Sequence, residues 1–265
     1  DVVFHVTEKR TGNINFGATV GQGTGVGGFI GLDEPNLFGR GKRMQFQWQF
    51  GKNINDFSIT YTDPSIKGSR ISGSVGVHNQ RFRYVYADFG RQRLRGGNMQ
   101  LGFPLFGSNY TRLFLNYSID EQSFSGSSST TTFTNVFRCN YCVRSTLGTS
   151  IMRDTRIDMP FPTAGTMVQI GISQSGGPLG GAGNFQRIDA EEHFFAPIGT
   201  LGNPTTSSAK FVLGLKSRSG FVFGYSPFPQ QLFTLGGTQF FIPLRGYDEA
   251  SITPLGYDPN AAANG

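Results

Sequence analysis

The chain has 265 residues and a net charge of +6, and only 15% of its residues are charged. Its basic residues are scattered rather than clustered, which argues against nucleic-acid binding, while the scarcity of charge suits a protein with a large surface facing lipid. The combination of 38 glycines with 26 phenylalanines fits one large β domain or two ordinary ones.

The chain opens on a short strand-like segment, residues 2–6, with no secretion signal, which would be a basic stretch followed by an apolar one. We therefore expect either a mature N-terminus or, preferably, a segment of a longer protein. No apolar run approaches the roughly 18 to 20 residues that a membrane helix needs. If the chain crosses a bilayer, it does so with strands.

Alternation of apolar and polar residues, bounded by turn residues, predicts about eleven strands and almost no helix. In chain order they are expected at residues 13–22, 26–33, 43–51, 56–62, 70–78, 97–103, 111–122, 143–159, 167–174, 185–196 and 210–224. The clearest is the segment from Met44 to Phe50, where large apolar residues alternate with glutamines. Because side chains of a strand alternate between two faces, this strand has one apolar and one polar face.

The connections between these strands alternate in length. Residues 63–68, 104–109 and 160–165 are compact turns rich in Pro, Gly, Asn and Ser, whereas 79–95 and 123–140 are longer polar excursions. Short turns at one end and long loops at the other are typical of an up-and-down outer-membrane barrel. A water-soluble sandwich would also alternate, but it would not sort its loops in this way. The prediction is an all-β fold, a transmembrane antiparallel β-barrel.

The polar face is predicted to collect charges in the later strands. These are Asp154, Arg156 and Asp158, then Arg187, Asp189, Glu191 and His193, then Lys216 and Arg218. Charges of both signs can hydrate and pair in a water-filled interior, whereas a charge facing lipid at mid-depth costs roughly 2 to 4 kcal/mol. Arg153 and Glu192 break the alternation, which predicts a bulge there or an extension of those strands beyond the bilayer.

No constellation for catalysis, metal binding or a cofactor is found. Residues 23–28 match a G-x-G-x-x-G dinucleotide motif, but a strand follows where a helix would be needed. His5, His78 and His193 have no partner at ligand or triad spacing. Cys139 and Cys142 lack the context of a redox or zinc site, and two readings stay open for them: a disulfide at a loop end or two free thiols. We expect neither enzymatic activity nor a cofactor.

Two distinctive stretches carry a family resemblance. The first runs from Thr11–Gly17 to the Pro-Asn-Leu-Phe-Gly-Arg-Gly sequence ending at Gly41, and the second joins residues 233–237 to Leu-Arg-Gly-Tyr at 244–247. Together they resemble the BamA-type outer-membrane assembly proteins, a superfamily that joins periplasmic POTRA domains to a C-terminal barrel. In that family the Pro-Asn-Leu-Phe-Gly-Arg-Gly sequence forms the turn after the second strand. An Arg-Gly-Tyr/Phe motif lies at the tip of a loop folded into the lumen.

The resemblance implies a domain organisation. Residues 1–11 would be the end of the last POTRA domain, and residues 12–265 the N-terminal part of the barrel, with 226–265 forming the long lumenal loop. About eleven of an expected sixteen strands would be present. The implied location is the bacterial outer membrane of Gram-negative cells.

The implied function is assembly and insertion of outer-membrane β-barrel proteins, with incoming strands templated at a lateral seam. The substrate-pairing residues would be Asn13, Ile14, Asn15, Phe16, Gly17, Ala18, Thr19, Val20 and Gly21. Arg245 would pin the lumenal loop to a carboxylate, Gly246 would allow the tight tip, and Tyr247 would pack beneath it. The implied partners are the lipid bilayer, unfolded barrel substrates, and accessory assembly lipoproteins of a BAM complex bound through upstream POTRA domains.

An alternative within the same resemblance is a POTRA-barrel transporter of the two-partner secretion type, or a TamA-like translocation factor. Single-channel conductance and translocation of a cognate secreted protein would support that function. A plain porin is disfavoured, because it would give no reason for the POTRA-like start or for the Arg-Gly-Tyr motif.

Overall fold

The computed structural model describes residues 11–21, 25–84, 90–125, 141–203, 207–226, 233, 235–236, 244–247 and 252. Its eleven strands are β1 (Asn13–Gly21), β2 (Gly25–Leu37), β3 (Lys42–Gly51), β4 (Ile54–Asp63), β5 (Ser72–Tyr84), β6 (Gly90–Pro104), β7 (Thr111–Ser125), β8 (Tyr141–Asp154), β9 (Gly165–Gly176), β10 (Asn184–Asn203) and β11 (Ser207–Tyr225). Three short 3-10 helices, η1 (Ile66–Gly68), η3 (Leu105–Gly107) and η4 (Gly177–Leu179), lie in the connections. None of the described helices has the length and apolar character required to cross a bilayer.

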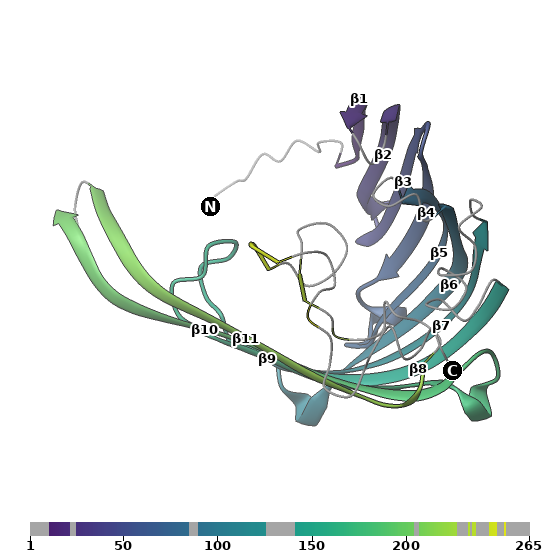
Figure 1. The fold of residues 1–265 in the computed structure, drawn as a ribbon. Coiled ribbons are helices and arrows are strands. Elements are labelled where there is room, and N and C mark those ends of the chain that lie inside the picture. The colour runs from purple at the N-terminus through teal and green to yellow at the C-terminus, as the bar shows by residue number, and fades with distance from the viewer. Residues whose placement is uncertain are drawn as a thin grey trace.

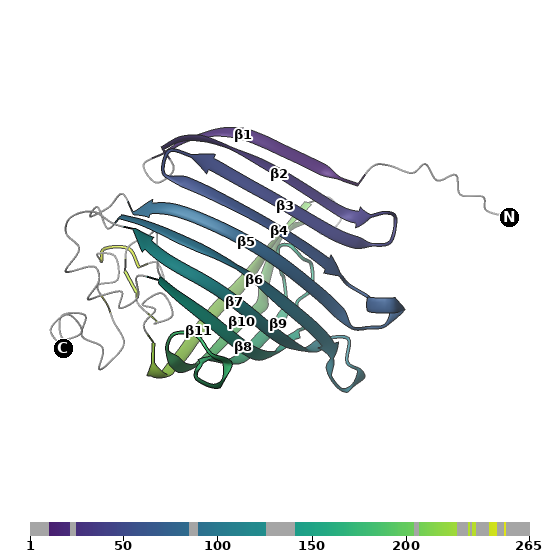
Figure 2. The ribbon, with the colours of Figure 1, turned by 90° about the vertical axis from the view of Figure 1, so that its right-hand side faces the viewer.

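All eleven strands form one sheet in chain order, and each is antiparallel to the next. Figure 1 shows this sheet as a curved wall with β1 at one end and the β10–β11 hairpin at the other, and Figure 2 shows the strands side by side. The sheet is open, and β1 and β11 are its edges. The predicted all-β class, strand number and up-and-down order are confirmed.

Several strands extend further than predicted. β5 and β6 occupy most of the predicted excursion at 79–95, and pairing continues to Tyr84 opposite Gly90. Backbone pairing does not require an apolar face, so it persists where the alternation of side chains has ended. Conversely, β8 ends at Asp154 rather than at residue 159. Beyond it, only an isolated bridge joins Ile157 to Ala164.

Of the two explanations predicted for Arg153 and Glu192, the bulge is not found, because the register runs through both residues without a shift. The described bulge in β10 instead lies between Pro197 and Gly199. A proline cannot donate a ladder hydrogen bond, which makes it a natural place for the pairing to slip.

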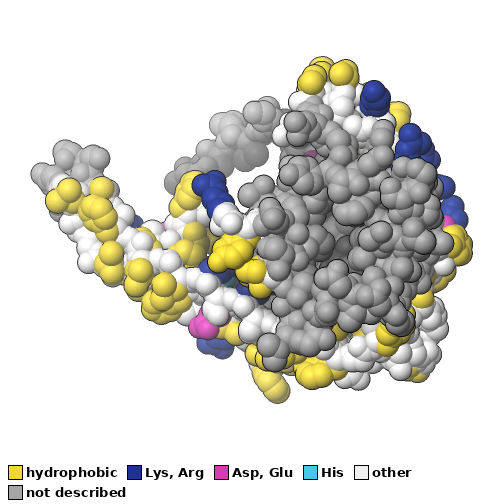
Figure 3. Space-filling model, in the orientation of Figure 1, with side chains coloured by type: hydrophobic (Ala, Val, Ile, Leu, Met, Phe, Trp, Pro, Cys, Tyr) yellow, Lys and Arg dark blue, Asp and Glu magenta, His cyan; other side chains and the backbone are white. Residues whose placement is uncertain are grey.

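The register defines two faces. One face carries the large apolar residues and turns them away from the protein: the exposed fraction is 80% for Phe16, 83% for Val20 and 61% for Phe221. Apolar side chains are visible on the outer rim in Figure 3. We call this convex side the outward face and the concave polar side the inner face. Such exposure is expected of a surface in contact with lipid rather than water.

Phenylalanine rings lie over glycines at several positions of the sheet. A Cβ placed on Gly17 would lie 2.6 Å from the ring of Phe29, and one on Gly102 would lie 2.9 Å from the ring of Phe114. Ordinary contact begins near 3.4 Å, so each ring occupies the space where a side chain would be. The aromatic ring covers the strand backbone that glycine leaves bare.

Candidate functional site: an open strand edge and a charged inner wall

The nine predicted substrate-pairing residues all lie in β1, which pairs with β2 from Asn13 opposite Asp33 to Gly21 opposite Gly25. Within the described residues β1 has no partner on its other side. Ile14, Phe16 and Val20 point outward and are among the most exposed apolar side chains of the sheet.

The two ends of β1 are held differently. At the Asn13 end, the hydroxyl of Thr11 donates a hydrogen bond of 2.7 Å to Glu34, and the same carboxylate oxygen accepts from the backbone N–H of Asn36. At the other end, Gly21 pairs with Gly25, and neither contributes a side chain. A side-chain hydrogen bond thus links β1 to its neighbour at the Asn13 end, whereas the Gly21 end has no side chain at that pair.

Gly17 has a role that sequence reasoning missed. Predicted only as a substrate-pairing residue, Gly17 lies under the ring of Phe29 on the inner face. The sequence could have indicated this contact, because Gly17 and Phe29 lie opposite each other once the position of the β1–β2 turn is known.

The later strands carry a network of paired charges on the inner face. Asp189 accepts hydrogen bonds from Arg187 at 2.8 and 2.9 Å and lies 3.8 Å from Arg218. Glu191 lies 2.7 Å from the ring of His193 and 2.8 Å from the ammonium of Lys216. These pairs confirm the prediction that the charges of β10 and β11 share the polar face, where they neutralise one another.

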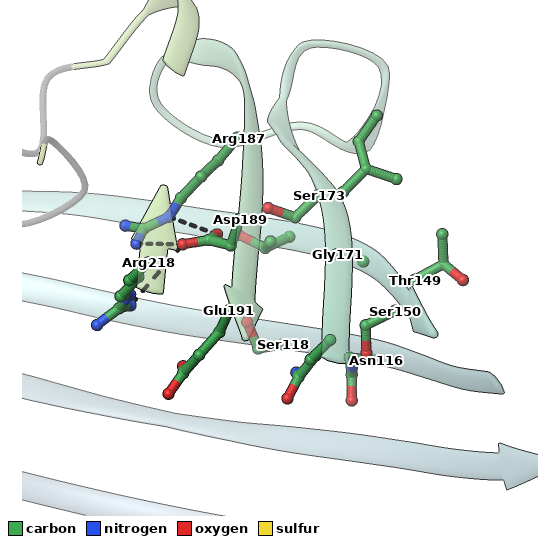
Figure 4. Close-up of a pocket in the computed structure, with 14 residues that line it drawn as sticks. Asn116, Ser118, Thr149, Ser150, Gly171, Ser173, Arg187, Asp189, Glu191 and Arg218 are labelled. Carbon is green, nitrogen blue, oxygen red and sulfur yellow. Dashed lines mark hydrogen bonds and ion pairs between the residues drawn. The ribbon is translucent and has the colours of Figure 1, made fainter. Parts of the chain in front are cut away.

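These charges border a polar hollow of about 390 Å³ on the wall formed by β7 to β11. Figure 4 shows Arg187, Asp189, Glu191 and Arg218 at its rim, with small polar residues of β7, β8 and β9 across from them. Among the charged residues predicted around the end of β8, Asp154 pairs with Arg156 at 2.7 Å. Asp158 lies beyond β8 in a connection, so its placement in a strand was wrong.

A second cluster joins residues that the sequence left without partners. His78 lies 3.2 Å from Asp120, which also accepts a hydrogen bond of 2.7 Å from Arg144. The three residues occupy one row across β5 to β8, with Gly96 between His78 and Asp120. A Cβ on Gly96 would lie 2.6 Å from the Asp120 carboxylate. The absence of a side chain there lets His78 reach across β6.

The segment after β11 contacts the inner wall through Phe233. Its ring lies over Gly220, and the guanidinium of Arg187 is 4.2 Å from the ring centroid. Beyond it, Leu235 and Ile252 form an antiparallel bridge with hydrogen bonds of 2.9 and 3.0 Å. This bridge brings together the two arms of the segment that carries the predicted Arg-Gly-Tyr motif.

Arg245, Gly246 and Tyr247 form an exposed turn after Leu244. Gly246 has a φ of 86°, a conformation that favours glycine. No ion pair joins Arg245 to a carboxylate in the part of the chain that the structure describes, and Tyr247 is 55% exposed. The structure therefore brings Phe233, rather than the predicted motif, onto the described wall.

The remaining predictions concern the two cysteines, the two ends of the chain and metal binding. Cys142 is disulfide-bonded, which decides between the two readings of the cysteines, while Cys139 lies outside the described residues. Residues 1–10, expected to end a POTRA domain, and most of the expected loop at 226–265 also lie outside them. Among the described side chains there is no group of three or more His, Cys, Asp or Glu that could hold a metal ion.

Known proteins resemble this chain in sequence and in fold. Sorting and assembly machinery component 50 homolog A of Xenopus laevis is 26% identical over 191 residues, covering 72% of this chain and 40% of that protein. The outer membrane protein assembly factor BamA of Nitratidesulfovibrio vulgaris is 25% identical over 263 residues, covering 96% of this chain and 30% of the relative. The chain thus spans less than half the length of these relatives.

A crystal structure of BamA from Haemophilus ducreyi lacking POTRA domains 1–3 superposes with a TM-score of 0.65 at 18% identity, covering 93% of this chain and 48% of that one. At this identity the likeness establishes the fold. The sequence pattern of the Omp85 superfamily domain matches residues 36–263. Because that match extends from β2 to beyond β11, the chain belongs to the Omp85 superfamily.

Proposed function

We propose that this chain forms the N-terminal strands of an outer-membrane β-barrel that assembles other β-barrel proteins into the membrane. The observation that carries the proposal is a single antiparallel sheet, β1 to β11 in chain order with an apolar outward face, in an Omp85 superfamily member. Relatives named as an outer membrane assembly factor and as sorting and assembly machinery components support the same general activity.

The location follows from the same similarity. One relative is bacterial, several are from vertebrates, and another is named a chloroplastic outer envelope protein. These names support an outer membrane in general. The bacterial outer membrane is our proposal and rests on the BamA-type motifs at residues 33–41 and 244–247.

In the proposed mechanism, the free backbone groups of β1 pair with a terminal strand of an incoming barrel protein. An unmade backbone hydrogen bond inside a bilayer costs several kcal/mol, so a partly folded substrate gains by completing its pairs on β1. Because Ile14, Phe16 and Val20 face outward, the new strand continues the lipid-facing surface. No covalent bond is made or broken, and no cofactor is required.

Release of the substrate requires that the substrate strand separate from β1 again. The hydrogen bond between Thr11 and Glu34 keeps one end of β1 in register, while Gly21 and Gly25 at the other end contribute no side chains to the packing. Glycine in a strand costs on the order of 0.5 to 1 kcal/mol relative to alanine. We propose that the seam opens from the Gly21 end.

The lumenal loop would stabilise the barrel from within. We propose that Arg245, held at the turn with Gly246 and Tyr247, reaches a carboxylate on a strand outside this chain, since a guanidinium presents a planar fork of donors suited to such a pair. Accessory lipoproteins would act through POTRA domains upstream of residue 11, and unfolded barrel proteins would be the substrates.

Cysteine crosslinking in the full-length protein tests the β1 edge. Single cysteines at positions 13 to 21 are combined with a stalled barrel substrate carrying a cysteine in its last strand, and crosslinks are expected along β1. Cysteines at Met99 and Leu115, which face outward in the middle of the sheet, serve as controls. Crosslinks at the controls with none in β1 would refute the edge assignment, and conductance with translocation of a secreted partner would favour a transporter.

A further inference from the structure

The outward face of β5 and β6 changes character abruptly along the strands. On β6 it runs through Leu101, Met99 and Gly97 and then continues as arginine at positions 95, 93 and 91. On β5 it runs through Val75 and Val77 to Asn79 and then Arg81. The register places Arg81 directly opposite Arg93. Four arginines therefore lie together on the outward face, just beyond its apolar band.

Within the described part of the chain, this cluster has fewer anionic partners than would neutralise it. Among the described residues its only carboxylate is Glu121, which pairs with Arg95 at 2.6 Å, so four positive groups and one negative group leave a net charge of +3. The Nε of Arg93 donates to the Asn79 side chain at 3.2 Å. Like charges directly opposite each other on an antiparallel pair destabilise it. An anion between Arg81 and Arg93 would remove that repulsion.

The position of the cluster matches a membrane interface. Two residues of a strand advance about 7 Å, so Arg95 to Arg91 spans about 14 Å along β6, or roughly 10 Å along the membrane normal for a strand tilted by about 45°. The headgroup layer on each side of the hydrocarbon core is about 5 to 7 Å thick. Arginines that begin where the apolar band ends therefore reach through this layer.

The surface beneath the arginines is hollowed and partly apolar. A depression of about 590 Å³ is lined by the apolar residues Phe57, Val77, Ile119 and Val143 and by polar ones, His78, Asn79, Arg93, Arg95 and Glu121. In the register, Gly97 lies between Val77 and Ile119 and has no side chain to fill the surface there. Figure 3 shows Lys and Arg side chains following one another along the right-hand edge, where β4 to β7 lie in Figure 1.

We propose that this surface is a binding site for an anionic membrane lipid in the leaflet on the side of the 85–89 connection. The phosphate groups would contact Arg81, Arg91 and Arg93, and the acyl chains would lie in the apolar depression. A soluble phosphate ion would use the arginines but not the depression, so the amphiphile is the better match. The inference requires only that the sheet sits in a membrane, and it does not depend on the assembly function.

Native mass spectrometry of the full-length protein in a neutral detergent tests this site. The protein is titrated with phosphatidylglycerol, with diphosphoryl lipid A, or with phosphatidylcholine. Selective binding of either anionic lipid is expected, and R81Q/R91Q/R93Q is expected to weaken it by about fivefold for each arginine. Arg95 is kept because it pairs with Glu121. The matched control is Arg153→Gln, an exposed outward arginine at the tight-turn end of β8, which should leave the affinity unchanged.

Equal anionic-lipid affinities of the wild type and the triple variant would overturn the proposal. So would a loss of selectivity on adding inorganic phosphate at low millimolar concentration, which would identify a soluble ion as the ligand. Folding of each variant is checked by heat-modifiable gel mobility. Should the triple variant not fold, the three single variants are compared instead, and wild-type affinity in all three would likewise refute the site.

Discussion

The contact between Phe233 and Gly220 predicts that one methyl-sized group controls the docking of the lumenal segment. In Gly220→Val the new Cβ would clash with Cζ of the Phe233 ring, far inside the ordinary contact distance of 3.4 Å, so the ring must move away. The half-buried ring would lose its burial, worth at most about 1.5 to 3 kcal/mol. It would also lose its cation–π contact with Arg187, worth about 0.5 to 1 kcal/mol.

Together these terms predict a loss of roughly 2 to 4 kcal/mol, or a drop of about 30- to 1,000-fold in the ratio of docked to undocked segment. The ratio can be followed through the labelling rate of a Leu235→Cys reporter with a soluble maleimide in the full-length protein. The rate should rise in Gly220→Val. It should stay the same in Gly199→Val, since a Cβ on Gly199 meets nothing within 4 Å.

A double variant separates this explanation from a general loss of stability. If the valine acts only by expelling the ring, then Gly220→Val adds nothing to Phe233→Ala, because the clash has already been removed. Additive effects of the two substitutions, or an unchanged labelling rate in Gly220→Val alone, would refute the reasoning.

Three further outcomes are expected. Asp120→Ala removes the carboxylate buried against Arg144 and should lower the free energy of unfolding by about 3 kcal/mol, measured by urea titration in vesicles; a loss below 1 kcal/mol would contradict the buried pair. Gly17→Leu should cost about 1 to 3 kcal/mol in the same titration, because the ring of Phe29 has to move, and Phe29→Ala should reduce that cost. Arg245→Ala should weaken the barrel and its assembly activity, whereas unchanged heat-modifiable mobility and unchanged growth would argue against the proposed pair.

Features that depend on a single strand were predictable from the sequence. The alternation from Met44 to Phe50 defines one apolar and one polar face by itself, because successive side chains of any strand point in opposite directions. The shared polar face of Arg187, Asp189, Glu191 and His193 followed in the same way, since residues two apart lie on one face, whereas the contact of His193 with Glu191 was not predicted. The family motifs also indicated the superfamily before the fold was known.

Features that depend on two or more strands were missed. His78 was judged to have no partner, yet it reaches Asp120 across a glycine of the strand between them. The arginines at 81 and 93 were counted as loop residues, although strand pairing places them opposite each other. In both cases the decisive information is the register between adjacent strands. This register is set by hydrogen bonding across the turns and cannot be read from the composition of either strand.

The amino-acid sequence by itself determined that this protein is a series of antiparallel strands with one face suited to lipid and one suited to water. Only the tertiary structure decided which residues share a row, how far the pairing extends, and where rings such as Phe233 come to lie over glycines. The physical reason is that a strand's two-residue period is local, whereas the register, the curvature of the sheet and the return of the chain onto its inner face arise from contacts between distant segments.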